Sequence, residues 1–475
     1  MTPDAARIGA PRQLLDRNVA VLVLLAACVF AWPVYWNGFP LVFSDTGVYI
    51  AAALEHFAPW DRPIFYSVFL GVVGKSVSLY GAVLFQSLMA VYVIVIFHRT
   101  FSERDNALGP LWPLLILAIA TPLPWLTSWL IPDFPAGLAV LILFMLLFLR
   151  DKLDRVNSLV LALVLYFTLV THTGTFLVSV LALPLALMVA WAARRRFSRR
   201  GLVEVLVVVV ASYVSLAGVN AVAYKRWTIN VGSEAFLLNR LIQAGLVQPY
   251  LARVCELQSD LVLCPYQEEI KNFVGTDEFL WGKDPLAFRV GAASTNTGEA
   301  RALVLQTVAD SPWDVAAVMA RDSARQFAMA GAPCGSESGG SDCFISYGEG
   351  EYVQTRLEAH YPQAFEKFLA SRQQRSDLDY SSFLPVHEAV FWLFLVATLG
   401  VLLVGRRTGD RLAMVLAIYA VCVLALNAVV HGSLSGPAPR YQAKLSWLVV
   451  LVAISCVQRI RARSLSASGR SPETL

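Results

Sequence analysis

The dominant pattern of this chain is a series of apolar stretches separated by short polar segments. A helix that crosses a bilayer needs about 17–25 mostly apolar residues, and stretches of about this length recur throughout. They predict about ten spans, near 18–36, 81–97, 111–130, 134–149, 157–171, 174–193, 202–222, 386–404, 412–430 and 442–458. Two are weak, because prolines interrupt the third and only a four-residue turn separates the fifth from the sixth. The pattern therefore predicts an all-α integral membrane protein.

Composition supports this class. The chain is 57% hydrophobic and only 15% charged, whereas a soluble protein carries about 25% charged residues. A soluble enzyme is excluded. We expect membrane lipids as partners and no nucleic acid.

Basic residues predict how the chain lies in the membrane. They cluster before the first span and after the second, fourth, sixth, eighth and last: Arg7, Arg12, Arg17; His98, Arg99, Arg104; Arg150, Lys152, Arg155; Arg194 to Arg200; Arg406, Arg407, Arg411; Arg459 to Arg463. With ten spans all six clusters fall on one side. The positive-inside rule then makes both termini cytoplasmic, and we expect a multi-pass protein of the inner (plasma) membrane.

One long polar segment interrupts the spans on the opposite, outer side. Residues 223–385 hold 14 Lys or Arg and 20 Asp or Glu, a net charge of −6, against +10 for the rest of the chain. A segment of this length can bury its own core. We expect a membrane domain over 1–222 with a first outer loop at 37–80, a periplasmic loop domain over 223–385, membrane helices over 386–460 and a disordered cytoplasmic tail over 461–475.

The outer segment has helical spacing and cysteines. Helix-compatible patterns run over 236–246, 300–308, 315–329 and 352–371, so a mostly helical loop domain is expected. The apolar triplet at 279–281 is interpreted as core, with an acceptor groove as the alternative. Four cysteines allow three pairings, and their nine-residue separations favour Cys255–Cys264 and Cys334–Cys343. Four free thiols are the alternative.

Candidate chemistry begins in the first outer loop. Asp45 and Tyr49 are four residues apart and share one face if a helix begins at Ser44. An acid there can accept a proton, although it could simply cap the helix. Asp61, Arg62 and a proline then restart the chain as a helix, so Asp61 is interpreted as a cap. Arg62 could hold a phosphate, or extend to lipid headgroups.

Further polar residues lie at the outer ends of other spans. Asp133 opens the fourth span, as a cap or as a group that positions substrate or a metal. His172 lies in the outer turn between the fifth and sixth spans, where a lone histidine is usually just hydrogen-bonded. Arg440 and Lys444 are one helical turn apart before the last span. They could grip a phosphate or diphosphate, or anchor to headgroups.

Taken together, these residues resemble the GT-C superfamily of membrane glycosyltransferases, which use polyprenyl-phosphate sugars. The resemblance covers the membrane part and rests on four places: Asp45 and Tyr49 in an Asp-x-x-x-Tyr context; Arg62-Pro63-Ile64-Phe65-Tyr66-Ser67 in place of Arg-Pro-Pro-x-Tyr-Pro; Asp133 in a Pro-Asp pair; and Arg440-Tyr441 before the last span. Nothing in 223–385 resembles the family.

The resemblance implies a mechanism. Asp45 would take the proton from the acceptor hydroxyl, with inversion at the anomeric carbon. Arg62, Arg440 and Lys444 would stabilise the departing polyprenyl phosphate. The family's first loop often holds an adjacent acid pair, but Thr46 follows Asp45 here, so a divalent metal is only a possible cofactor. Two rivals stay open: a lipid or glycolipid transporter or flippase, and a non-catalytic assembly protein. The sugar and the acceptor (lipid, glycan or protein) are not identified by the sequence.

Overall fold

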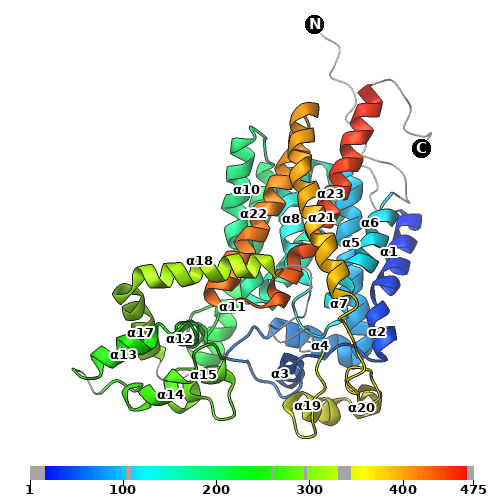
Figure 1. Cartoon of the computed structure of the whole chain (residues 1–475). Coiled ribbons are helices and arrows are strands. Elements are labelled where there is room, and N and C mark those ends of the chain that lie inside the picture. Colours follow the sequence, from blue (N-terminus) through cyan, green and yellow to red (C-terminus); the bar gives the residue numbers. More distant parts are fainter. Residues whose placement is uncertain (1–15, 103–108, 258–259, 294–296, 330–343, 468–475) are drawn as a thin grey trace.

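The computed structural model of the chain describes residues 16–102, 109–257, 260–293, 297–329 and 344–467. These residues form an all-helical protein (Figure 1). Within these ranges there is no strand, only a single bridge between Leu41 and Trp129.

Seven helices are long and apolar enough to cross a membrane. They are α1 Arg17–Phe30 continued by α2 Trp32–Asn37, α5 Leu79–Ser102, α10 Thr173–Ala192, α11 Arg199–Tyr224, α21 Leu384–Thr408, α22 Arg411–Leu434 and α23 Pro439–Ala467. Each overlaps one of the ten predicted spans. The chain is therefore a multi-pass membrane protein, while the count of about ten is not confirmed.

The other three predicted spans are occupied by shorter apolar helices. The third is split into α6 Leu111–Ala120 and α7 Leu123–Ser128, because Thr121 is extended and Pro122 cannot continue the helix. The fourth and fifth are α8 Pro135–Phe148, followed by the short η1 Arg150–Lys152, and α9 Arg155–Thr171. At about 1.5 Å per residue the 14 residues of α8 extend about 21 Å, less than the hydrocarbon core of about 30 Å. Every residue of α8 is buried.

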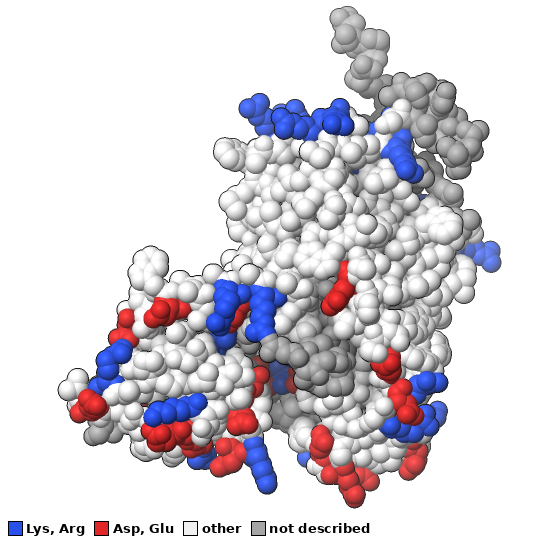
Figure 2. Space-filling model, in the orientation of Figure 1, with Lys and Arg blue, Asp and Glu red and all other residues white. Residues whose placement is uncertain are grey.

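The two ends of the helix bundle differ in charge. The described chain begins and finishes at one end, which we call the terminal end (Figure 1). Lys and Arg side chains line that end above a broad uncharged surface (Figure 2). Several are neutralised there: Arg459 lies 2.9 Å from the buried Asp410, and Arg150 lies 2.6 Å from Glu204.

The opposite end, the lobe end, carries two groups of short helices. The first lobe contains α12 Ser233–Gln243, α13 Val247–Val254, η2 Cys264–Tyr266, α14 Gln267–Lys271, α15 Glu278–Trp281, α16 Leu286–Arg289 and α17 Thr297–Asp310. The next helix, α18 Pro312–Ala328, connects this lobe to the bundle. The second lobe contains α19 Tyr352–His360 and α20 Pro362–Leu369. The first lobe has a hydrophobic core of its own, whereas buried residues of α19 and α20 belong to the core of the bundle. The segment 223–385 therefore does not share one core.

Local sequence explains the lobe helices. All four predicted helical segments are helical, and the segment 352–371 is divided at Tyr361 because Pro362 begins a new helix. The predicted Cys255–Cys264 disulfide is present, with Cα atoms 5.5 Å apart. Cys334 and Cys343 lie outside the described residues. The remaining cysteines, Cys28, Cys422 and Cys456, are free thiols.

Two helices connect the bundle to the lobes. They are α3 Ser44–Leu54 and α4 Phe65–Ser76. The predicted helix after Ser44 is confirmed, and it packs against α19. A Cβ atom on Gly47 would come within 2.8 Å of the Val353 backbone in α19, so glycine permits a close crossing that covers α3. Both helices lie between the two lobes (Figure 1), and Figure 2 shows a hollow between the lobes at the base of the bundle.

One predicted boundary is wrong. The tail was expected to be disordered from residue 461, but α23 continues to Ala467. The extension carries Arg463, whose guanidinium lies 3.2 Å from Asp410 at the start of α22. This ion pair favours continued helix beyond the apolar stretch. Residues 468–475 lie outside the described part of the chain.

Candidate functional site

A cluster of charged side chains lies at the lobe end, where α3, the loop before α4 and the first turns of α23 meet. Asp45 is in the first turn of α3, and its Oδ1 lies 2.9 Å from Nη1 of Arg62. Nη2 of Arg62 lies 2.6 Å from Oδ2 of Asp61. Arg62 thus joins two carboxylates, and its side chain is only 12% exposed. The prediction that Asp61 caps the following helix is wrong, because the N-cap of α4 is Ile64, without a side-chain bond.

Asp45 does not cap its helix. The amide of Phe43 donates to the hydroxyl of Thr46 at 2.9 Å, and that hydroxyl in turn donates to the carbonyl of Leu130 at 3.1 Å. The carboxylate of Asp45 is left to face Arg62, and its side chain is 28% exposed. A carboxylate in the first helical turn is also favoured by the helix dipole.

The chain leading to Asp45 is held by a glutamine far away in the sequence. The side-chain amide of Gln373 accepts from the amide of Val42 at 3.1 Å and donates to the carbonyl of Val42 at 2.8 Å. Asn37 accepts from the backbone of Gln373 at 2.8 Å. These buried bonds fix the extended segment before α3, and therefore also fix the position of Asp45 at the start of that helix.

Arg440 approaches Asp45 from the other side. Its Nη1 lies 4.0 Å from Oδ2 of Asp45, and its guanidinium packs over the rings of Phe43 and Tyr441, 4.6 Å and 5.2 Å from their centroids. The side chain is 24% exposed. Of the cluster's three cations, Arg440 is the most accessible, and its contact with Asp45 is the loosest.

The loop before Arg440 is clamped by α18. Gln326 donates to the carbonyl of Ala438 at 2.9 Å and accepts from its amide at 2.8 Å. Arg240 and Asp322 form a buried ion pair, and Arg240 also donates to the carbonyl of Ser433 at 3.3 Å. The connection between α22 and α23 is therefore a turn held in place by side-chain bonds.

A second group of charges is sealed from solvent. Lys444, one turn after Arg440 on α23, is 0% exposed, and its Nζ lies 2.6 Å from Oδ1 of Asp133, which is 4% exposed. Nε2 of His172 lies 3.3 Å from the same Nζ. Asp133 is thus not the cap of α8, whose N-cap is Phe134 without a side-chain bond.

The environment sets the protonation of this second group. Burial disfavours the Asp133 carboxylate, but Lys444, Arg440 and His172 outweigh it and lower the pKa of Asp133 to about 2. Burial also lowers the pKa of His172 to about 3, and the charge of Lys444 adds to the effect. His172 caps α10 by accepting from the amide of Thr175 at 3.2 Å. It is therefore a neutral, hydrogen-bonded histidine.

Aromatic rings separate the two groups. The ring of Tyr441 stacks on His431 with centroids 4.6 Å apart and lies 4.9 Å from Nζ of Lys444. On α3, the ring of Tyr49 lies 5.3 Å from the Arg62 guanidinium. Burial raises the pKa of Tyr49, so the hydroxyl stays protonated.

We call Asp45, Asp61, Arg62 and Arg440 the open half of the cluster, and Asp133, His172 and Lys444 the sealed half. Together they contain three acids, two arginines, a lysine paired with an acid, and a neutral histidine. The charges balance, so an incoming anion must exchange places with an internal partner. That exchange is easiest at Arg440, because its bond to Asp45 is long and partly exposed.

All eight predicted site residues are brought together at this end of the bundle. Sequence reasoning missed the residues that hold them: Gln326, Gln373 and Arg240 act through backbone contacts that leave no local pattern. It also missed Tyr347, a buried residue close to the start of α3. Burial raises its pKa, and the charge of Asp45 adds to the shift.

No three His, Cys, Asp or Glu side chains of the described residues are grouped as a metal site. In the sealed half, the ammonium of Lys444 occupies the position between Asp133 and His172 where a cation would be held. The use of a divalent metal therefore stays a prediction.

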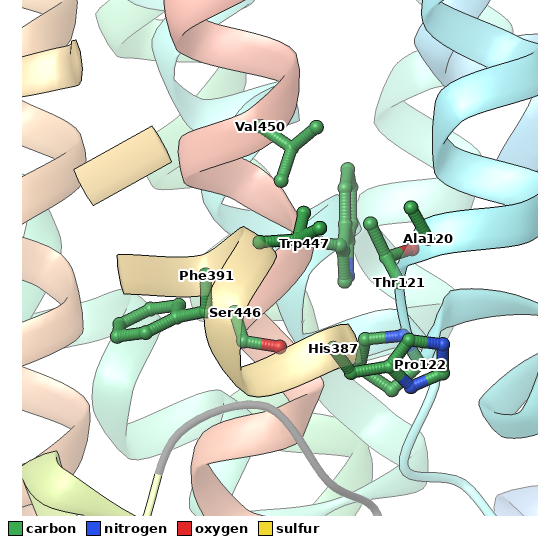
Figure 3. Close-up of a pocket in the computed structure, with 9 residues that line it drawn as sticks. Ala120, Thr121, Pro122, His387, Phe391, Ser446, Trp447 and Val450 are labelled. Atoms are coloured by element: carbon green, nitrogen blue, oxygen red, sulfur yellow. The ribbon is translucent and has the colours of Figure 1, made fainter. Parts of the chain in front are cut away.

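A recess behind the cluster is separate from it. It lies where α6 ends at Thr121 and Pro122, and is bordered by His387 of α21 and Trp447 of α23 (Figure 3). Its nine lining residues include no Asp, Glu, Lys or Arg. The recess thus lacks the charged chemistry of the cluster.

Comparison of the chain with protein-family profiles, curated proteins and solved structures finds no match. The case for a function therefore rests on the geometry of the cluster.

Proposed function

We propose that this protein is a GT-C-type glycosyltransferase that moves a sugar from a polyprenyl-phosphate donor to an acceptor at the outer face of the inner membrane. In this proposal the terminal end of the bundle faces the cytoplasm and both lobes are periplasmic. About ten helical segments cross the membrane or enter it. The observation that carries the proposal is the open half: a partly exposed carboxylate between two arginines, one of them loosely held.

The reaction uses Asp45 as the general base. Its carboxylate takes the proton of the acceptor hydroxyl, whose oxygen forms a bond to the anomeric carbon of the donor. The bond from that carbon to the phosphate oxygen breaks with inversion, and the electron pair leaves on the polyprenyl phosphate. Arg62, whose Nη1 lies 2.9 Å from Oδ1 of Asp45, holds the carboxylate of the base in place before the acceptor arrives.

Arg440 stabilises the leaving phosphate. Its guanidinium is the most accessible cation of the cluster, and a phosphate can accept two parallel hydrogen bonds from it. Lys444 acts differently from the role that the resemblance implies. Because it is buried against Asp133, it supports α23 from within and leaves the phosphate to Arg440.

The test is turnover of radiolabelled polyprenyl-phosphate sugars by the full chain in lipid nanodiscs, with membrane lipids and oligosaccharides as acceptors. Release of polyprenyl phosphate together with sugar transfer supports the enzyme. A parallel assay in liposomes measures movement of the same lipids across the bilayer. Lipid movement without release of sugar from any donor would contradict the proposal and favour a transporter.

A further inference from the structure

A group of aromatic rings adjoins the open half. Trp60, two residues before Arg62, stacks on Phe236 of α12 with centroids 5.8 Å apart and an interplanar angle of 12°. The ring of Phe288 lies 5.3 Å from Trp60, and that of Trp281 lies 6.1 Å from it. We call these four residues the aromatic platform.

The platform is half buried and half open. Trp281 is 50% exposed and Phe288 is 46% exposed, whereas the neighbouring Phe279 and Leu280 are fully buried in the core of the first lobe. The prediction that residues 279–281 are core is therefore confirmed for two residues and wrong for Trp281. Two large rings remain open to solvent beside a chain segment that enters the candidate site.

Exposed charged residues lie close in sequence to the two exposed rings. Glu278, Lys283, Asp284 and Arg289 belong to the same short stretch, and all four are exposed. Nε of Arg289 lies 3.5 Å from Asp284. A sugar has a face of C–H bonds that packs on an aromatic ring, and an edge of hydroxyls that bond to charged groups. An isoprenoid tail would bind poorly beside these charged residues, because burying an apolar chain against charged groups is unfavourable.

The backbone joins the platform to the open half. Gly232 donates to the carbonyl of Trp60 at 3.0 Å, and a Cβ atom on Gly232 would come within 2.6 Å of the Trp60 ring. Asn230 donates to the carbonyl of Asp61 at 3.4 Å. The first lobe is thus attached at the residue before Arg62.

We propose that the aromatic platform is a carbohydrate-binding subsite, which holds a sugar unit of a glycan acceptor while the acceptor hydroxyl reaches Asp45. This inference rests on the proposed function and adds the class of acceptor. Trp281 and Phe288 supply the stacking surface, and the charged residues of the same stretch orient the hydroxyls.

The experiment is binding of the full chain, in labelled nanodiscs, to an array of linear and branched oligosaccharides of hexoses, N-acetylhexosamines, pentoses and uronic acids. Trp281→Ala and Phe288→Ala are compared with Trp281→Tyr, which keeps a ring. Trp313→Ala is the matched control, because Trp313 lies on α18 outside the platform and is 85% exposed. We expect wild type and the Trp313 variant to bind one class of glycan, and Trp281→Ala to weaken binding about ten-fold or more.

Absence of glycan binding by wild type, or equal binding by Trp281→Ala, would overturn the inference, as would capture of only lipid or protein through Trp281. The donor-turnover assay separates this result from the proposed function. Wild type and Trp313→Ala, which keeps the platform intact, should turn over donor at the same rate in that assay. Glycan binding without turnover of any donor would remove the proposed transferase and leave the subsite standing.

Discussion

The open and sealed halves of the polar cluster contain the same kinds of side chain in different surroundings. In the sealed half, Lys444 and Asp133 are 2.6 Å apart and 0% and 4% exposed. In the open half, Arg440 and Asp45 are 4.0 Å apart and 24% and 28% exposed. A short buried pair is fixed because separating it leaves a charge without a partner. A long exposed pair can exchange its partner for a ligand. Residue type alone therefore does not distinguish a reactive charge from a supporting one.

The largest expected effect comes from breaking the sealed pair. Lys444→Met leaves Asp133 buried and unpaired, which should lower the free energy of unfolding by about 3–5 kcal/mol. The double variant Lys444→Met/Asp133→Leu removes both charges and should recover most of that loss. Thermal unfolding in one detergent measures both. A Lys444→Met protein as stable as wild type but unable to turn over donor would move Lys444 into the open half.

The next effect sharpens the open half. Arg440→Met removes the accessible cation, so sugar transfer should fall about 100- to 1,000-fold, as when a group that stabilises developing charge is lost. The thermal midpoint should stay close to wild type, because the lost pair is partly exposed. Arg440→Lys keeps the charge without the two-pronged grip and should fall in between. A stability loss as large as that of Lys444→Met would erase the distinction between the halves.

A smaller effect is expected from the clamp on the α22–α23 connection. Gln326→Ala removes both bonds to Ala438, so Arg440 should lose its fixed position. We expect transfer to fall about ten-fold, within the range that small misplacements cause. Gln306→Ala is the matched control, since Gln306 lies in the first lobe, where it accepts from the hydroxyl of Tyr250 at 2.7 Å. Equal rates for the two variants would remove Gln326 from the positioning of Arg440.

The smallest expected effect is a change in how the stability of the protein depends on pH. His172 has its pKa lowered to about 3 when folded, against about 6.5 in an unfolded chain. Between these values the unfolded state binds the extra proton, so the stability contributed by His172 is present above pH 6.5 and declines as the pH falls toward 3. His172→Asn keeps a capping acceptor and cannot titrate. Its thermal midpoint should fall less than that of wild type between pH 7 and pH 4. Parallel pH profiles would contradict a buried neutral His172.

Much of the fold follows from apolar patterning. Seven of the ten predicted spans are long apolar helices, and the prolines near residue 122 correctly indicate a weak third span. Pattern alone does not predict that α8 is short and buried on every side, because this depends on how many neighbours pack around it. Nor does it predict the division of residues 223–385 between two cores.

The candidate site was predictable in membership but not in pairing. Charged residues at the outer ends of apolar helices must meet partners or water, so Asp45, Arg62 and Arg440 can be found in the sequence. Which cation faces which acid depends on how helices far apart in the chain pack together. Lys444 illustrates this limit: its spacing from Arg440 suggests a shared ligand, but the helix turns it inward to Asp133. The side-chain amides of Gln326 and Gln373 are uncharged, so no charge pattern in the sequence indicates their supporting role.

The most direct test of a reactive open half is the rate of polyprenyl phosphate release by Asp45→Asn in nanodiscs. Glu55→Gln is the matched control, because Glu55 ends the same helix and pairs with Arg356 at 2.6 Å, away from the cluster. Loss of a general base predicts a rate about 100- to 10,000-fold below wild type for Asp45→Asn, at an unchanged thermal midpoint and with Glu55→Gln near wild type. A wild-type rate in Asp45→Asn would contradict the account.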